Sequence, residues 1–210
     1  MSKRVDKYVV DFCNDCLNVL QEYDVKLRKN LLDSEFKIFY KYDSKGLAVY
    51  SITEPILKFL IFSSLCYKYQ IWPESSFYKG KQLLDIALFT RRINNIDKEI
   101  EPDVAIEMKW AAVKKSGEFN KWSLKSLIDD ILKLHKESET QNKYVMQFLV
   151  LHSDTQEIDN KVLEEQVFAG IDKRKFKSKD VKILFNKCFD TKGKDEKEKW
   201  KFYILLWGIK

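Results

Sequence analysis

The chain has 210 residues, of which 45% are hydrophobic and 33% are charged, with six glycines and three prolines. This composition excludes a disordered or fibrous chain, and the length is typical of one domain with elaborations. The net charge of +6 favours a polyanionic partner and argues against functions that need an acidic surface.

Residues 1–52 are expected to form an N-terminal elaboration made of one or two helices and a hairpin. Apolar residues repeat at helical spacing between positions 5 and 32, and the strand-like segments 36–42 and 47–51 flank an Asp-Ser-Lys-Gly turn. Cys13 and Cys16 lie on the apolar face of this helix, so we interpret them as core residues rather than redox or metal ligands.

No apolar run at the start of the chain resembles a signal peptide, and no uncharged apolar run reaches the length of a membrane span. We therefore expect a cytoplasmic protein that does not associate with a membrane. The four cysteines also lack the paired spacings of a structural zinc site.

The predicted core covers residues 53–151 and begins with a helix. Thr53 is a suitable N-cap, and the Glu54-Pro55 pair is typical of a first helical turn. The following residues, 56–69, are apolar enough to predict a largely buried helix. A buried helix of this kind is expected to lie against a sheet.

Two strand-like segments, 83–90 and 104–111, follow this helix, and the polar stretch that joins them predicts an antiparallel pair. Leucine and isoleucine then repeat at helical spacing from Ser123, which predicts an amphipathic helix ending near Ser138. Residues 144–151 are almost continuously apolar, as is typical of a central strand buried on both faces.

Residues 152–210 are expected to complete the sheet with a helix and further strands. The pattern predicts a short helix at 162–171 and late strands at 181–185 and 202–207. Because the sequence has no internal repeat and no interdomain linker, we interpret residues 1–210 as a single domain. Its predicted fold class is α/β, with a mixed central β-sheet flanked by helices.

Two charged side chains interrupt a strand that is otherwise built for a core. Alternation along residues 104–110 places Glu107 and Lys109 on one face of the strand and the apolar residues on the other. Because isolated charges are costly to bury, this pair needs a partner, a metal or water. Asp85 supplies a second carboxylate on the preceding strand, and magnesium binds through one or two carboxylates and several waters. A bound divalent cation assists phosphodiester hydrolysis.

This set of residues resembles the motif of the PD-(D/E)xK nuclease superfamily, which has the restriction-endonuclease-like fold, and the likeness covers the predicted core. The resemblance implies that Asp85, Glu107 and the Met108 backbone carbonyl bind Mg²⁺, with Mn²⁺ as a substitute. It further implies that Lys109 is catalytic and that Glu54, on the preceding helix, is an auxiliary acid of the site.

Several features of the motif have other readings. Leu84 stands where the family motif has a proline, and Glu54 also suits the first turn of a helix because of the helix dipole. Asp103 precedes Glu107 on one strand by roughly 13 Å, so we do not expect both carboxylates to hold one ion.

Residues outside the motif are assigned structural roles with one exception. Asp130 and Lys133 lie three apart on a predicted helix, and we interpret them as a surface ion pair rather than as a pair behind the site. Trp110 is expected in the core. Trp122 would stack on nucleic-acid bases if its ring is exposed.

The resemblance implies a magnesium-dependent DNA endonuclease of a restriction or other anti-phage system, acting on both strands as a homodimer. One alternative is a structure-specific repair nuclease that resembles a junction resolvase. Another is a catalytically silent module that binds nucleic acid or an unidentified protein partner. RNA stays open as a substrate because no residue pattern that reads the 2′-hydroxyl is visible.

Overall fold

In the computed structural model, the described residues are 3–32, 54–75, 83–90, 101–138, 140–152, 155–171, 176–177, 179–192 and 199–210. The expected hairpin at 36–51 and the N-cap Thr53 lie outside the described residues. The helices are α1 (Lys3–Leu32), α2 (Glu54–Leu65), α3 (Lys121–Glu137) and α4 (Asn160–Gly170). The strands are β1 (Gln70–Ser75), β2 (Leu84–Phe89), β3 (Val104–Trp110), β4 (Lys143–His152), β5 (Val181–Lys192) and β6 (Lys199–Ile209).

The six strands form one mixed sheet in the order β1-β2-β3-β4-β6-β5. β3 and β4 are parallel, whereas every other neighbouring pair is antiparallel. Parallel neighbours need a crossover connection, and α3 provides it between β3 and β4. The predicted α/β class with a mixed sheet and the predicted antiparallel pairing of β2 with β3 are both confirmed.

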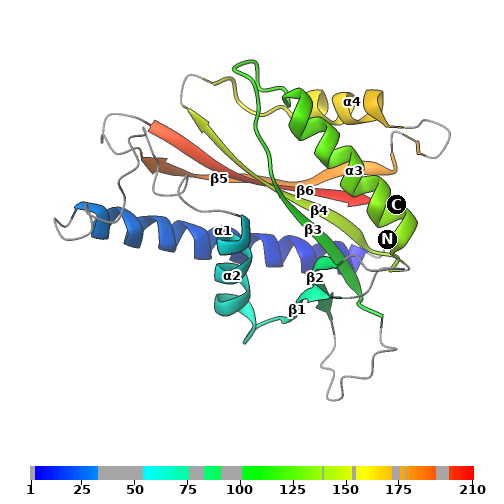
Figure 1. Cartoon of the computed structure of the whole chain (residues 1–210), viewed down its shortest axis with the longest axis horizontal. Helices are drawn as coiled ribbons and strands as arrows, with labels where there is room; N and C mark the ends of the chain where they lie inside the picture. Colours follow the sequence, from blue (N-terminus) through cyan, green and yellow to red (C-terminus); the bar gives the residue numbers. More distant parts are fainter. Residues whose placement is uncertain are drawn as a thin grey trace.

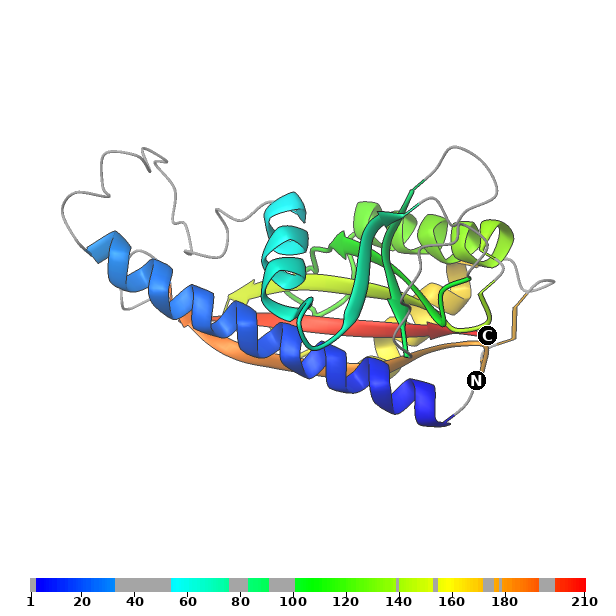
Figure 2. The same ribbon diagram turned by 90° about the horizontal axis from the view of Figure 1, so that it is seen from below.

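Helices cover both faces of this sheet, with α1 and α2 on one face and α3 and α4 on the other (Figure 1, Figure 2). β4 shows the division most clearly because its side chains alternate between two buried clusters. Tyr144 and Met146 pack with α1, whereas Val145 and Leu149 pack with α3 and α4. The expectation that this strand is buried on both faces is confirmed.

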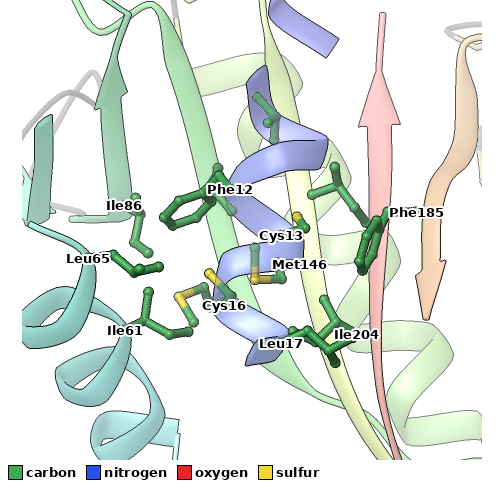
Figure 3. Close-up of a cluster of buried hydrophobic side chains, with 14 of the residues drawn as sticks. Phe12, Cys13, Cys16, Leu17, Ile61, Leu65, Ile86, Met146, Phe185 and Ile204 are labelled. Atoms are coloured by element: carbon green, nitrogen blue, oxygen red, sulfur yellow. The ribbon is translucent and has the colours of Figure 1, made fainter. Parts of the chain in front are cut away.

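α1 is a single helix that packs along the sheet. Cys13 and Cys16 are 0% exposed on its inner face, which confirms that they are core residues (Figure 3). Further along the helix, the buried Asp24 carboxylate accepts a hydrogen bond from the Thr191 hydroxyl of β5 at 2.7 Å. Among the described helices, none combines the length and apolar character needed to cross a membrane.

Two strands differ from the sequence prediction for identifiable reasons. β1 was not expected, because it is short and contains Pro73, a residue that is rare inside strands. β5 extends beyond the predicted 181–185. The prediction was too short because this strand lies at the edge of the sheet, where polar residues at exposed positions interrupt the apolar pattern. Its pairing with β6 also shifts between Ile183 and Phe185, where a bulge interrupts the alternation.

Candidate functional site

The structure brings Asp85 and Glu107 to facing positions on β2 and β3. Backbone pairing runs to Ile86 and Ile106, and continuing the register by one residue sets Asp85 opposite Glu107. At this point the Met108 backbone N–H donates to Asp85 Oδ2 at 2.7 Å. Because the N–H and carbonyl of a strand residue point to the same neighbour, the Met108 carbonyl also faces β2.

Both carboxylates are nearly buried, and a lysine contacts each of them. Asp85 is 8% exposed, and its Oδ1 lies 2.6 Å from Lys58 Nζ on α2. Glu107 is 2% exposed, and its Oε1 lies 2.8 Å from Lys133 Nζ on α3. Like charges that face each other on adjacent strands repel. The two ammonium groups offset this repulsion between the carboxylates of Asp85 and Glu107.

Lys109 extends from β3 on the same side as Glu107, and a carboxylate from α3 lies near it. Its Nζ lies 4.0 Å from Asp130 Oδ2, and its side chain is 31% exposed. Asp130 itself is 7% exposed, so the prediction of a surface ion pair with Lys133 is wrong. The two residues share a face of α3, and that face points at the strands that carry the motif.

Glu74 and Lys58 were missed by the sequence analysis. The pairing of β1 with β2 leaves Glu74 opposite Asp85, and Glu74 Oε1 lies 3.4 Å from Lys58 Nζ. Glu74 has a φ of 48°, a left-handed conformation that residues with side chains rarely adopt and that is often found at functional sites. A signal for Lys58 was present: it lies one helical turn after Glu54. Glu54 begins α2, and its side chain lies outside the described part of the chain.

Gln147 is a second buried polar residue that the sequence analysis passed over. It pairs with Lys109 in the register of β3 and β4 and is 1% exposed. Its Oε1 accepts a hydrogen bond from Trp207 Nε1 at 2.8 Å, which fixes the orientation of the amide. Its signal was a lone polar side chain within an apolar strand.

Three residues outside this cluster also have clear environments. The Asp103 carboxylate accepts hydrogen bonds from the backbone N–H and hydroxyl of Thr90, at 2.7 and 2.8 Å. Trp110 packs edge-on against Phe148 in the core, as predicted. Trp122, in contrast, is 64% exposed.

The donor atoms of the site fit a hard cation, because Asp85, Glu107 and the Met108 carbonyl all offer oxygen. Within the described residues, no three His, Cys, Asp or Glu side chains are grouped so that they could hold a metal. Magnesium needs fewer protein ligands because it keeps several waters. Lys58 and Lys133 each contact one oxygen of a carboxylate, so a cation that used these two oxygens would displace the ammonium groups.

No protein-family model, curated protein or solved structure matches this chain. The arrangement of the side chains around Asp85, Glu107 and Lys109 is therefore the basis for inferring a function.

Proposed function

We propose that this protein is a magnesium-dependent DNA endonuclease with its active site at Asp85, Glu107 and Lys109. The observation that carries the proposal is the facing pair of nearly buried carboxylates, with the Lys109 ammonium on the same side of the sheet. The order of elements supports it. A helix, three antiparallel strands, a crossover helix and a parallel strand follow each other as the PD-(D/E)xK resemblance implies.

Hydrolysis of a phosphodiester requires water to form a bond to phosphorus while the bond to the leaving oxygen breaks, with a proton finally carried to that oxygen. A bound magnesium ion would polarise the phosphoryl group and lower the pKa of a bound water. In this protein, Asp85, Glu107 and the Met108 carbonyl would hold the ion. Lys109, whose ammonium lies 4.0 Å from Asp130, would orient the attacking water or stabilise charge on the phosphoryl oxygens.

Lys58 and Lys133 would take on a second role when magnesium binds. Each ammonium now offsets a carboxylate, and a divalent cation would take over that role. The released ammonium groups would remain within reach of the site, where they could pair with phosphate oxygens of the substrate. The net charge of +6 supports a polyanionic substrate.

Restriction or other anti-phage defence is the setting that we propose, by analogy with the family that the motif resembles. Cleavage of both strands of a duplex would be achieved by a homodimer, because two sites related by a two-fold axis match duplex symmetry.

Cleavage of supercoiled, linear and branched DNA in magnesium tests the proposal. Wild type is compared with Asp85→Asn, Glu107→Gln and Lys109→Met, which preserve side-chain size while removing charge. We expect each variant to lose at least about 100-fold in cleavage rate, the order of effect seen when one group that stabilises transition-state charge is removed. A preference for branched over linear DNA would indicate a repair nuclease instead of a restriction enzyme.

Asp190→Asn and Lys182→Met are matched controls, because both residues are exposed on β5. They should cleave at the wild-type rate. Cleavage that survives in the three site variants would reject the assignment of the site.

A catalytically silent binding module is the second candidate, and one observation favours it. Because each buried carboxylate already contacts a lysine, the site can be stable without any metal. Calorimetric titration separates the candidates: magnesium binding that Glu107→Gln abolishes favours the nuclease, whereas no binding to wild type favours the silent module.

A further inference from the structure

The first turn of α3 displays an exposed tryptophan between two lysines. Trp122 is 64% exposed, and Lys121 and Lys125 are both exposed beside it. Single exposed hydrophobic residues are common, so exposure alone does not indicate a binding surface. The lysines on either side of the ring provide the second indication. The hairpin that leads into α3 adds the exposed Lys115, whereas the exposed Lys114 forms an ion pair with Glu118 at 3.2 Å. We call Lys121, Trp122 and Lys125 the Trp122 surface.

This surface lies on the same side of α3 as the candidate site. Trp122 and Lys133 are eleven residues apart in one helix, which is close to three turns, so their side chains leave α3 in nearly the same direction. The separation along the helix axis is about 16 Å at 1.5 Å per residue. Lys133 contacts Glu107, so α3 connects the exposed ring to the carboxylates.

One backbone N–H at the start of α3 is already bonded within the helix. The Asn120 side chain accepts from the Ser123 N–H at 2.8 Å and caps the helix. The indole ring and the lysine side chains are the groups of this surface that we consider for ligand binding.

We infer that the Trp122 surface binds an unpaired stretch of the nucleic-acid substrate, an inference that rests on the proposed function. A base has an apolar face that can stack on indole, and the phosphates on either side carry charge that Lys121 and Lys125 can neutralise. At about 3.4 Å per stacked nucleotide, the 16 Å to Lys133 corresponds to about five nucleotides. Asp129 is exposed on the same face and would repel a strand that passed over it.

Fluorescence anisotropy with a labelled 20-nucleotide oligothymidylate, in EDTA to prevent cleavage, tests this inference on the full chain. Trp122→Ala should weaken binding about 5- to 150-fold, the effect of losing one base stack, whereas Trp122→Phe should retain most of the affinity. Replacing both lysines with glutamine should reduce the slope of log K against log salt by about 1.4, since two phosphate contacts are lost. Asp129→Asn should tighten binding.

Controls separate this surface from general effects. Tyr67→Ala removes a ring that is 83% exposed elsewhere, and Lys182→Gln removes an exposed lysine on β5; neither should change binding. Equal loss of duplex binding in Trp122→Ala, or unchanged oligonucleotide binding, would overturn the inference. Displacement of the oligonucleotide by polyglutamate at equal charge concentration would also overturn it, because that result indicates an acidic protein partner.

The binding assay and the cleavage assay fail independently. Magnesium-dependent cleavage together with wild-type binding by Trp122→Ala would reject only the Trp122 surface. Binding that depends on Trp122, without cleavage of any DNA, would reject the nuclease proposal and leave a single-strand binding protein.

Discussion

Glu107 lies 2.8 Å from an ammonium that its own strand does not carry, and its exposure is 2%. The lysine comes from α3, so the charge balance of the site depends on how that helix packs against β3. Removing one partner of a buried ion pair lowers the free energy of unfolding by more than the intact pair contributes to it. The reason is that an unpaired charge then remains in a poorly solvated place. Lys133 is therefore the residue whose loss should be felt in both folding and metal binding.

Lys133→Met should lower the free energy of unfolding by about 3 kcal/mol without metal, since an opposite charge is withdrawn from a buried carboxylate. Magnesium should restore part of this loss, because the ion would supply the missing positive charge. Urea unfolding with and without magnesium measures both effects. Equal stabilisation of wild type and variant by magnesium would contradict a metal site at Glu107, and Lys182→Met serves as the surface control.

At the level of single residues, alternation in β3 was enough to predict that Glu107 and Lys109 share a face. It was not enough to predict which charged side chains from other elements contact the site. Lys58 and Lys133 reach the carboxylates from different helices, and such contacts depend on helix packing rather than on spacing in the sequence. Asp130 was misread for the same reason.

The connection between β3 and α3 sets the positions of Asp130 and Lys133 relative to the site. A short hairpin closes it, with a bridge between Val113 and Phe119. Gly117 lies in this hairpin with a φ of +80°, a conformation that glycine adopts without the strain of a side chain. An added Cβ would also lie 3.2 Å from the Glu157 carbonyl oxygen.

Gly117→Ala should destabilise the protein by about 1–2 kcal/mol because of the left-handed backbone. Gly170→Ala is the comparison. There the new Cβ would lie 2.5 Å from Ile128 Cδ1, the far end of a flexible side chain that can move away, so we expect a smaller loss. Urea midpoints measured side by side decide the matter, and an equal or larger loss in Gly170→Ala would show that the strain at Gly117 is not the cause.

Elements with strong periodicity were predictable from the sequence, whereas the edge strand β1 was missed and the edge strand β5 was predicted only in part. β2, β3, α3 and β4 bury long apolar patterns, which local spacing reveals. β1 pairs through its backbone while Pro73 and Glu74 break any strand pattern, so it could be recognised only from its neighbour β2. The position of Glu74 in the site was hidden along with it.

On the scale of the whole molecule, α1 provides much of one buried layer. Its inner residues pack mainly against β5, α2 and β6, and they share one buried cluster with residues of β2, β3 and β4. The sequence had instead suggested an elaboration attached to a core that begins at residue 53. Long sequence separation hides such packing, because nothing local indicates that the two layers meet. Burial in this layer raises the pKa of the Cys13 and Cys16 thiols, since the thiolate form is poorly solvated there.

Alkylation by iodoacetamide tests whether α1 is packed in solution. The thiolate is the reactive form, so the buried Cys13 and Cys16 should resist modification while the exposed Cys66 and Cys188 react. Mass spectrometry should find two modified cysteines in the native protein and four in urea. Modification of Cys13 as fast as Cys66 would mean that α1 leaves the sheet readily.

The proline in β1 and the bulge in β5 affect whether copies of this protein can associate through their sheet edges. A sheet edge with free N–H and carbonyl groups recruits further strands and can lead to fibrils. Pro73 removes one N–H from the β1 edge, while the bulge and the exposed Lys182 and Lys187 disturb the β5 edge. Strand addition is disfavoured on both sides, so the protein should resist fibril formation. The dimer proposed above would then associate through side chains rather than through the edges of its sheet.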